Sequence, residues 1–166
     1  MIISPLGPTF ISIINFGFYF LKLGFNMEEK VEKLKEEGWI NVWCAIEVLT
    51  TKEELAEKAL KKLANEMKAN PNLYIYEEKF LETREVEKPA KGVDKGYSKV
   101  MEISFLVKDL YSLIEFCVRY GPSAVEILEP EEIRVKIDEI QNLANFISGL
   151  MHQFVSAGIG GLVIKI

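Results

Sequence analysis

The succession of strand-like and helix-like segments is the feature that most constrains how this chain folds. Residues 39–50 (WINVWCAIEVLT) alternate between two faces, and so do residues 97–107 (YSKVMEISFLV). Alternation with a period of two indicates a strand that buries one face. The residues expected to share the buried face of the first strand are Val42, Cys44, Ile46 and Val48. Those expected to share one face of the second are Met101, Ile103, Phe105 and Val107.

An amphipathic helix is expected after each of these strands. Thr51 and Glu54 form a capping-box pattern that opens the first helix. Its expected buried residues are Leu55, Ala59, Leu63 and Met67. Asp109 is the expected N-cap of the second helix, and Gly121 is its expected stop. The expected core stripe of the second helix is Leu110, Leu113, Ile114, Cys117 and Val118.

Further strands are expected over residues 73–88 and 124–128, with a loop over residues 89–96. A short helix is expected from Met27 to Gly38. This order of elements predicts an α+β fold of the ferredoxin-like βαββαβ type. Such a fold has one antiparallel sheet with its two main helices on one face.

An additional long C-terminal helix is expected over residues 130–154, which completes a folded domain over residues 27–154. Pro130 suits the first turn of a helix, where its missing N–H costs nothing. Glu131 and Glu132 would complement the dipole of that turn.

A helix ending in glycine, a short strand, a proline and an Ile-Arg pair follow one another over about residues 109–136. The stretch reads LYSLIEFCVRYGPSAVEILEPEEIRVKI. This pattern resembles the C-terminal extension that follows the WYL domain in bacterial transcription regulators. The matching residues are Gly121, Val125, Ile127, Glu129, Pro130, Ile133 and Arg134. The resemblance implies a ferredoxin-like fold with a part in ligand response and oligomeric assembly. No WYL sandwich or helix-turn-helix precedes the stretch, so a free-standing relative is expected.

The expected last helix carries a wide apolar stripe whose members recur in steps of three and four, as in a heptad seam. These members are Ile137, Ile140, Ala144, Ile147, Met151 and Phe154. A helix over residues 130–154 would be about 37 Å long, whereas strands of five or six residues span about 20 Å. We therefore expect the stripe to be the interface of a homodimer or higher homo-oligomer. The alternatives are that the helix folds along the surface of its own domain, or that the N-terminal segment covers it.

Residues 1–26 are apolar and carry a single charge, on Lys22. Three interpretations stay open: a translated stretch upstream of a true start at Met27, a membrane anchor, or a strand-like arm that packs on a partner. Membrane association is expected only if this segment is genuine and inserted. The apolar tail over residues 155–166 is expected to add a strand to a neighbour.

Charge and composition narrow the possible partners. The chain has 25 Asp and Glu against 20 Lys and Arg, which argues against a nucleic-acid-binding surface. The acids are mostly Glu and the bases mostly Lys, a pattern reported for hyperthermophiles, so a thermophilic source is expected. Cys44 and Cys117 are expected to be unpaired, buried thiols in a reducing, cytoplasmic setting. No cofactor and no metal site are expected, because His152 is the single histidine.

No catalytic residues are predicted, since no constellation of acid, base and nucleophile is recognisable. Glu47 is expected on the open side of the sheet beside a lysine rather than as a general acid. His152 is expected to be a surface or interface histidine. A small-molecule ligand is expected to contact Trp43, Tyr74 and Tyr76, with Arg134 binding a negative group.

The sequence therefore favours a non-enzymatic, self-associating regulatory or ligand-sensing module. Two alternatives stay open, a small-molecule enzyme with a site between protomers and a membrane-tethered interaction protein. The sequence specifies neither the ligand, the protein partner nor the pathway.

Overall fold

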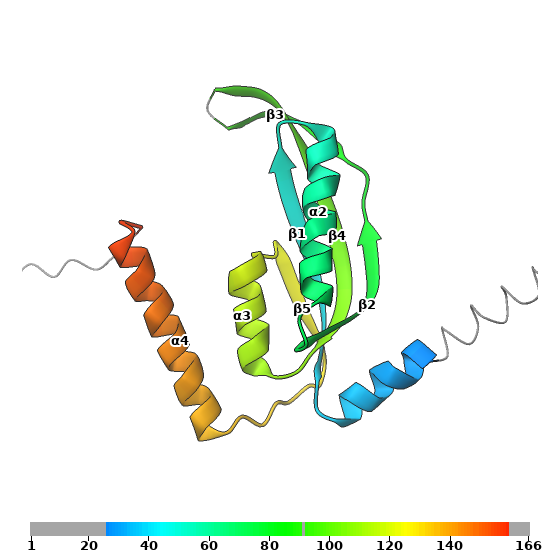
Figure 1. Cartoon of the computed structure of the whole chain (residues 1–166), viewed down its shortest axis with the longest axis vertical. Coiled ribbons are helices and arrows are strands. Elements are labelled where there is room, and N and C mark those ends of the chain that lie inside the picture. Colours follow the sequence, from blue (N-terminus) through cyan, green and yellow to red (C-terminus); the bar gives the residue numbers. More distant parts are fainter. Residues whose placement is uncertain (1–25, 91, 160–166) are drawn as a thin grey trace, which may run out of the picture.

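The computed structural model of the chain describes residues 26–90 and 92–159 (Figure 1). The first described element is a helix over residues 26–36. The later elements are β1 (Ile40–Thr50), α2 (Glu53–Lys68), β2 (Leu73–Phe80), β3 (Arg84–Ala90), β4 (Val93–Val107), α3 (Leu110–Tyr120), β5 (Ala124–Glu129) and α4 (Ile137–Ser156). The predictions for residues 1–25 and 160–166 lie outside the described residues.

The strands form one antiparallel sheet in the order β2-β4-β1-β5, and β3 also pairs with β4 (Figure 1). The 15-residue strand β4 pairs with β1 along one side and with β2 and then β3 along the other. Helices α2 and α3 each connect two strands that are not neighbours in the sheet. This confirms the predicted ferredoxin-like, α+β arrangement.

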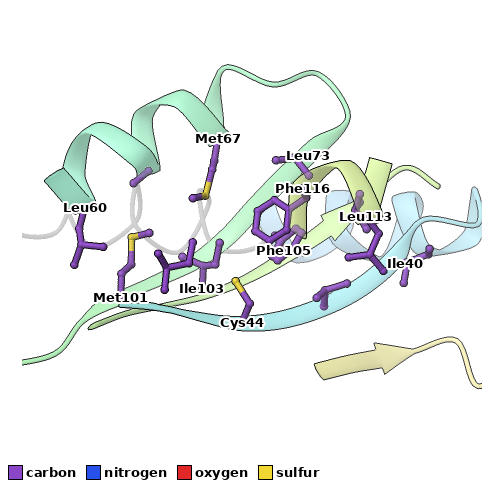
Figure 2. Packing of buried hydrophobic residues seen from close by; sticks show 14 residues of the cluster. Ile40, Cys44, Leu60, Met67, Leu73, Met101, Ile103, Phe105, Leu113 and Phe116 are labelled. Carbon is purple, nitrogen blue, oxygen red and sulfur yellow. The ribbon is translucent and has the colours of Figure 1, made fainter. Parts of the chain in front are cut away.

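The core lies between the sheet and the helices α2 and α3 (Figure 2). The predicted inward faces of β1 and β4 are confirmed, because their alternate residues from Val42 to Ile46 and from Met101 to Val107 are buried. Phe105 joins α3 to the sheet, since its ring centroid lies 4.6 Å from that of Phe116 on α3. The N-cap of α3 is also confirmed, because the Asp109 carboxylate accepts a 2.7 Å hydrogen bond from the Ser112 N–H.

The predicted buried face of α2 is confirmed at Met67, and its other three positions are wrong by one residue. The buried residues of α2 are Ala56, Leu60, Ala64 and Met67. Leu55 is exposed, and α2 begins at Glu53, so Thr51 is not its N-cap. Apolar side chains occupy adjacent positions along this helix, so the periodicity allows either phase. Contact with β1, β2 and β4 selects the observed one.

The stripe predicted for α3 is correct at its centre and wrong at its end. Leu113 is buried as expected, but Phe116 is the other large buried residue and Val118 is exposed. The predicted stop is confirmed, because Gly121 adopts φ 55° and ψ 51° and its N–H donates to the Cys117 carbonyl at 3.0 Å. This left-handed conformation favours glycine because it has no Cβ.

The single strand predicted over residues 73–88 is two strands. Phe80 pairs with Met101 and Arg84 pairs with Ser98, so the chain advances four residues opposite three of β4. The extra residue interrupts the ladder, as at a β-bulge. The loop predicted over residues 89–96 is instead part of the β3–β4 hairpin, with Gly92 at φ 81°.

The long helix predicted from Pro130 is wrong at its start. Helix α4 begins at Ile137, and residues 130–136 are non-helical and mostly exposed. The β-branched residues Ile133 and Val135 favour extended backbone, which outweighs the suitability of Pro130 for a first turn. Glu139 caps the true start by accepting a 3.3 Å hydrogen bond from the Lys136 N–H. At 20 residues, α4 is about 30 Å long.

Burial of Cys44 in this core generates a prediction about pH. Burial raises the pKa of the Cys44 thiol to about 12, whereas an exposed thiol has a pKa of about 8.5. The stability that comes from keeping this thiol neutral is complete below the unfolded pKa and is lost as the pH rises toward the folded pKa. We predict a fall in the free energy of unfolding from pH 9 to pH 11 that is shallower in Cys44→Ala, measured by guanidinium denaturation. Identical slopes for the two proteins would contradict the assignment.

Candidate functional site

The sheet face opposite α2 and α3, termed the open face, carries three of the residues predicted to contact a ligand. Trp43 lies on β1 and pairs in register with Ser104 of β4. Tyr74 and Tyr76 lie on β2, on the far side of β4, and all three aromatic residues are half-buried. The fourth predicted residue, Arg134, lies on the exposed segment 130–136 and not on the sheet.

A register shift in β2 shapes the open face. The pairing with β4 shifts between Ile75 and Glu77, so Tyr76 is the extra residue of a bulge. The Tyr76 hydroxyl reaches across β4 and donates to Asn41 Oδ1 at 2.8 Å. The next residue, Glu77, accepts a 3.2 Å hydrogen bond from the Ser104 hydroxyl. The sequence offered one signal for Asn41, since it precedes Trp43 by two residues and so shares its face.

The helix over residues 26–36 crosses one end of the open face. The Lys30 ammonium lies 4.3 Å from the ring centroid of Tyr74, on the edge strand β2. Lys35 Nζ lies 2.9 Å from Glu129 Oε2 on the opposite edge strand β5, and this hydrogen bond raises the pKa of Lys35. These two contacts link both edges of the sheet through one helix. The sequence carries no signal for either lysine, because only tertiary structure places them here.

Four residues lie in one row across the strands beneath this helix. Tyr74 pairs with Leu106, Leu106 with Asn41, and Asn41 with Glu129. Leu106 is fully buried and Asn41 nearly so, although both lie on the face without α2 and α3. The helix over residues 26–36 therefore shields this end of the open face and covers one side of the Tyr74 ring with an ammonium group.

A cavity of about 360 Å³ lies at the other end of the open face. Glu47 lines it on the open side of the sheet, as expected, together with Glu82 and Arg84. The predicted lysine partner is wrong, because the Ser98 hydroxyl donates to the Glu47 carboxylate. Alternation along β4 places Lys99 on the other face, where it lies 3.3 Å from Glu57 of α2.

His152 lies on the exposed surface of α4, four residues before the end of the helix. In the described part of the chain, no three His, Cys, Asp or Glu side chains are arranged to hold a metal ion. The helices within that same part fall short of the length and apolar character that crossing a bilayer demands.

The predicted interface residues lie along α4 with their side chains uncovered. Ile137, Ile140, Ile147, Met151 and Phe154 are between 40% and 86% exposed, and Ala144 is exposed as well. We call these six residues the α4 stripe.

A different side of α4 faces the domain. The ring of Phe146 lies edge-on to Tyr111 of α3, with centroids 5.5 Å apart. Leu143 and Leu150, which share this side with Phe146, are half-buried. Helix α4 therefore stands beside α3, away from the sheet (Figure 1). The α4 stripe is left exposed.

The model of the MJ0538 family matches residues 41–163, which include the sheet and all three of α2, α3 and α4. The chain belongs to the MJ0538 family. It is 25% identical over 116 residues to the uncharacterized protein MJ0538 of Methanocaldococcus jannaschii. This match covers 70% of the chain and 42% of the relative, so the chain spans less than half of the relative's length. No solved structure matches the chain significantly.

These comparisons give no support to the predicted resemblance to the WYL extension. One part of that resemblance also disagrees with the structure. The pair Ile133-Arg134, expected to open a helix, lies in the extended segment before α4. The ferredoxin-like fold remains, and it does not by itself carry a function.

The bond from Tyr76 to Asn41 generates a second prediction. Tyr76→Phe leaves the buried Asn41 amide oxygen without this donor, so we expect it to lower the free energy of unfolding by about 1–3 kcal/mol. Tyr74→Phe is the matched control, because its ring contact with Lys30 survives the change. Chemical denaturation measures both, and equal effects would argue against a structural role for the Tyr76 hydroxyl.

Proposed function

We propose that this protein is a non-enzymatic, self-associating regulatory module whose α4 stripe binds a second copy of the chain. The observation that carries the proposal is the exposure of five large apolar side chains along one helix. Large contiguous apolar surfaces on soluble domains usually mark interaction sites. A second copy fits because two-fold association is the commonest way to bury one surface of this kind.

The domain itself has little surface left for the stripe. Helices α2 and α3 cover most of the core face of the sheet, and the helix over residues 26–36 crosses one end of the open face. Helix α4 is apolar on two sides, one containing Phe146 and the other the stripe. A helix with two apolar sides needs two surfaces to cover it, and α3 supplies one of them.

The way the polar groups pair disfavours a catalytic role. The Tyr76 hydroxyl is engaged with Asn41, and the Ser104 hydroxyl with Glu77. Cys44 and Cys117 have thiol pKa values raised by burial, which disfavours the reactive thiolate. These observations support the proposal against the alternative of an enzyme with a site between protomers.

Charge placed in the stripe tests the proposal. The double variant Ile140→Asp with Ile147→Asp buries two carboxylates in the proposed interface, so we expect it to have the mass of one 18.9 kDa chain in light scattering. The unchanged protein is expected to have a multiple of that mass. Gln141→Asp with Ser148→Asp adds the same charges at the same spacing outside the stripe and should keep the oligomer.

Circular dichroism of both double variants would verify that α4 is still formed. Retention of the oligomeric mass by Ile140→Asp with Ile147→Asp would rule out the stripe as the interface.

Binding of a small aromatic or apolar ligand on the open face is a second candidate function. Its support is the gathering of Trp43, Tyr74 and Tyr76 on one face, beside a helix attached to it by surface contacts of Lys30 and Lys35. Aromatic side chains with a few polar groups are typical of small-molecule sites. Arg134 would reach this face only if segment 130–136 approaches it.

A thermal-shift screen against metabolites tests the second candidate. A ligand of the open face should raise the melting temperature by mass action, and Trp43→Ala should abolish that shift. Leu49→Ala, on the same strand and exposed, is the control that should preserve it. A ligand whose shift survives Trp43→Ala would place its site elsewhere.

A further inference from the structure

A second apolar surface lies at the edge of the domain, on β5 and α3. Val125 and Ile127 pair in register with Cys44 and Val42, whose side chains lie in the core. Both therefore face the same side of the sheet as α3. They are 41% and 47% exposed, and Val118 of α3 is 44% exposed. We call Val118, Val125 and Ile127 the β5–α3 shelf.

The shelf is uncovered because of where α3 packs. The large buried residues of α3 are Leu113 and Phe116, and Phe116 contacts Phe105 of β4 rather than β5. Strand β5 is the edge of the sheet, and all six of its residues are exposed. In the usual two-layer packing, the apolar side of such a strand is buried against another element.

The shelf and the α4 stripe are two uncovered apolar surfaces on one chain. Half-exposed large side chains contribute roughly 80–100 Å² each, so the stripe and the shelf together expose on the order of 800 Å². One partner contributes about this much area to an interface of standard size.

The chain's own α4 leaves its shelf uncovered. Its inward side is engaged with α3 through Phe146 and Tyr111, and its stripe is exposed on another side. The connection between the shelf and α4 is the exposed, non-helical segment 130–136. Helix α4 thus extends from its domain on an exposed connection, beside an apolar surface that it does not cover. This geometry allows two copies of the chain to cover each other's apolar surfaces reciprocally.

We propose that the α4 stripe of one chain packs on the β5–α3 shelf of a second chain, and that the second chain's stripe packs reciprocally on the first chain's shelf. This inference rests on the self-association proposed above and adds the surface that receives the helix. The arrangement covers both apolar surfaces of both chains with one two-fold contact. Packing of stripe against stripe would leave both shelves exposed.

Cross-linking between two proteins that each carry one exposed thiol tests the exchange. One carries Ile127→Cys on the shelf and the other Ile147→Cys on the stripe. Both carry Cys117→Ala and retain the buried Cys44. The two full-length chains, given tags of different mass, are unfolded, mixed, refolded together and treated with a short bis-maleimide. The exchange predicts a product that contains one chain of each kind, with a doubled mass on a denaturing gel.

Glu126→Cys is the matched control for Ile127→Cys, because Glu126 pairs with Trp43 and so faces the open side of β5. It should give little mixed product. Val125→Cys is a second shelf position should Ile127→Cys fail to fold, and it should give the same mixed product as Ile127→Cys.

The other outcomes separate this inference from the proposed function. A cross-link of the Ile147→Cys chain to itself, without mixed product, would show stripe-to-stripe packing. That result overturns the exchange and leaves self-association standing. A chain carrying both Ile127→Cys and Ile147→Cys that cross-links within itself, at the mass of one chain in light scattering, would overturn both.

Discussion

The pairing of β4 on both of its edges is the constraint on which the rest of the structure depends. This 15-residue strand carries β1 on one side and β2 followed by β3 on the other. Its inward residues from Met101 to Val107 are buried and form the floor on which α2 and α3 pack. Because a sheet has only two faces, this arrangement decides how much of the sheet surface remains for other elements to pack on.

Helix α4 is the element that packs on neither face of the sheet. Helices α2 and α3 cover the core face except at the β5–α3 shelf, and the row from Tyr74 to Glu129 lies beneath the helix over residues 26–36. Helix α4 is left beside α3 with one apolar side engaged and the stripe exposed. The proposed self-association follows because the described part of the domain does not cover the stripe, and an apolar stripe left in water is unfavourable.

The fold was predictable where the hydrophobic periodicity of a segment agrees with the capping residues at its ends. The alternation in β1 and β4 gave their buried faces correctly, and Asp109 and Gly121 gave the ends of α3. The buried face of α2 was not predictable from the sequence, because apolar residues at adjacent positions form two possible apolar stripes. Packing against the sheet decides which of the two is buried. The start of α4 was misread because Pro130 permits a helix without requiring one.

The candidate site was predictable only in part, for a similar reason. Alternation indicates which face Trp43 occupies, but the bulge at Tyr76 and the approach of Lys30 depend on long-range contacts. The predicted lysine partner of Glu47 failed because a shift of one position along β4 exchanges Ser98 for Lys99. Side-chain partners across strands depend on register, which a single sequence leaves undetermined.

Membership of the MJ0538 family establishes the relationship of the chain, and the uncovered α4 stripe supplies the hypothesis about its role. Sedimentation equilibrium of the unmodified chain is the most direct test of that hypothesis. The account predicts a mass that is a multiple of 18.9 kDa at micromolar concentration. A mass of 18.9 kDa at every concentration, with α4 still helical, would contradict it.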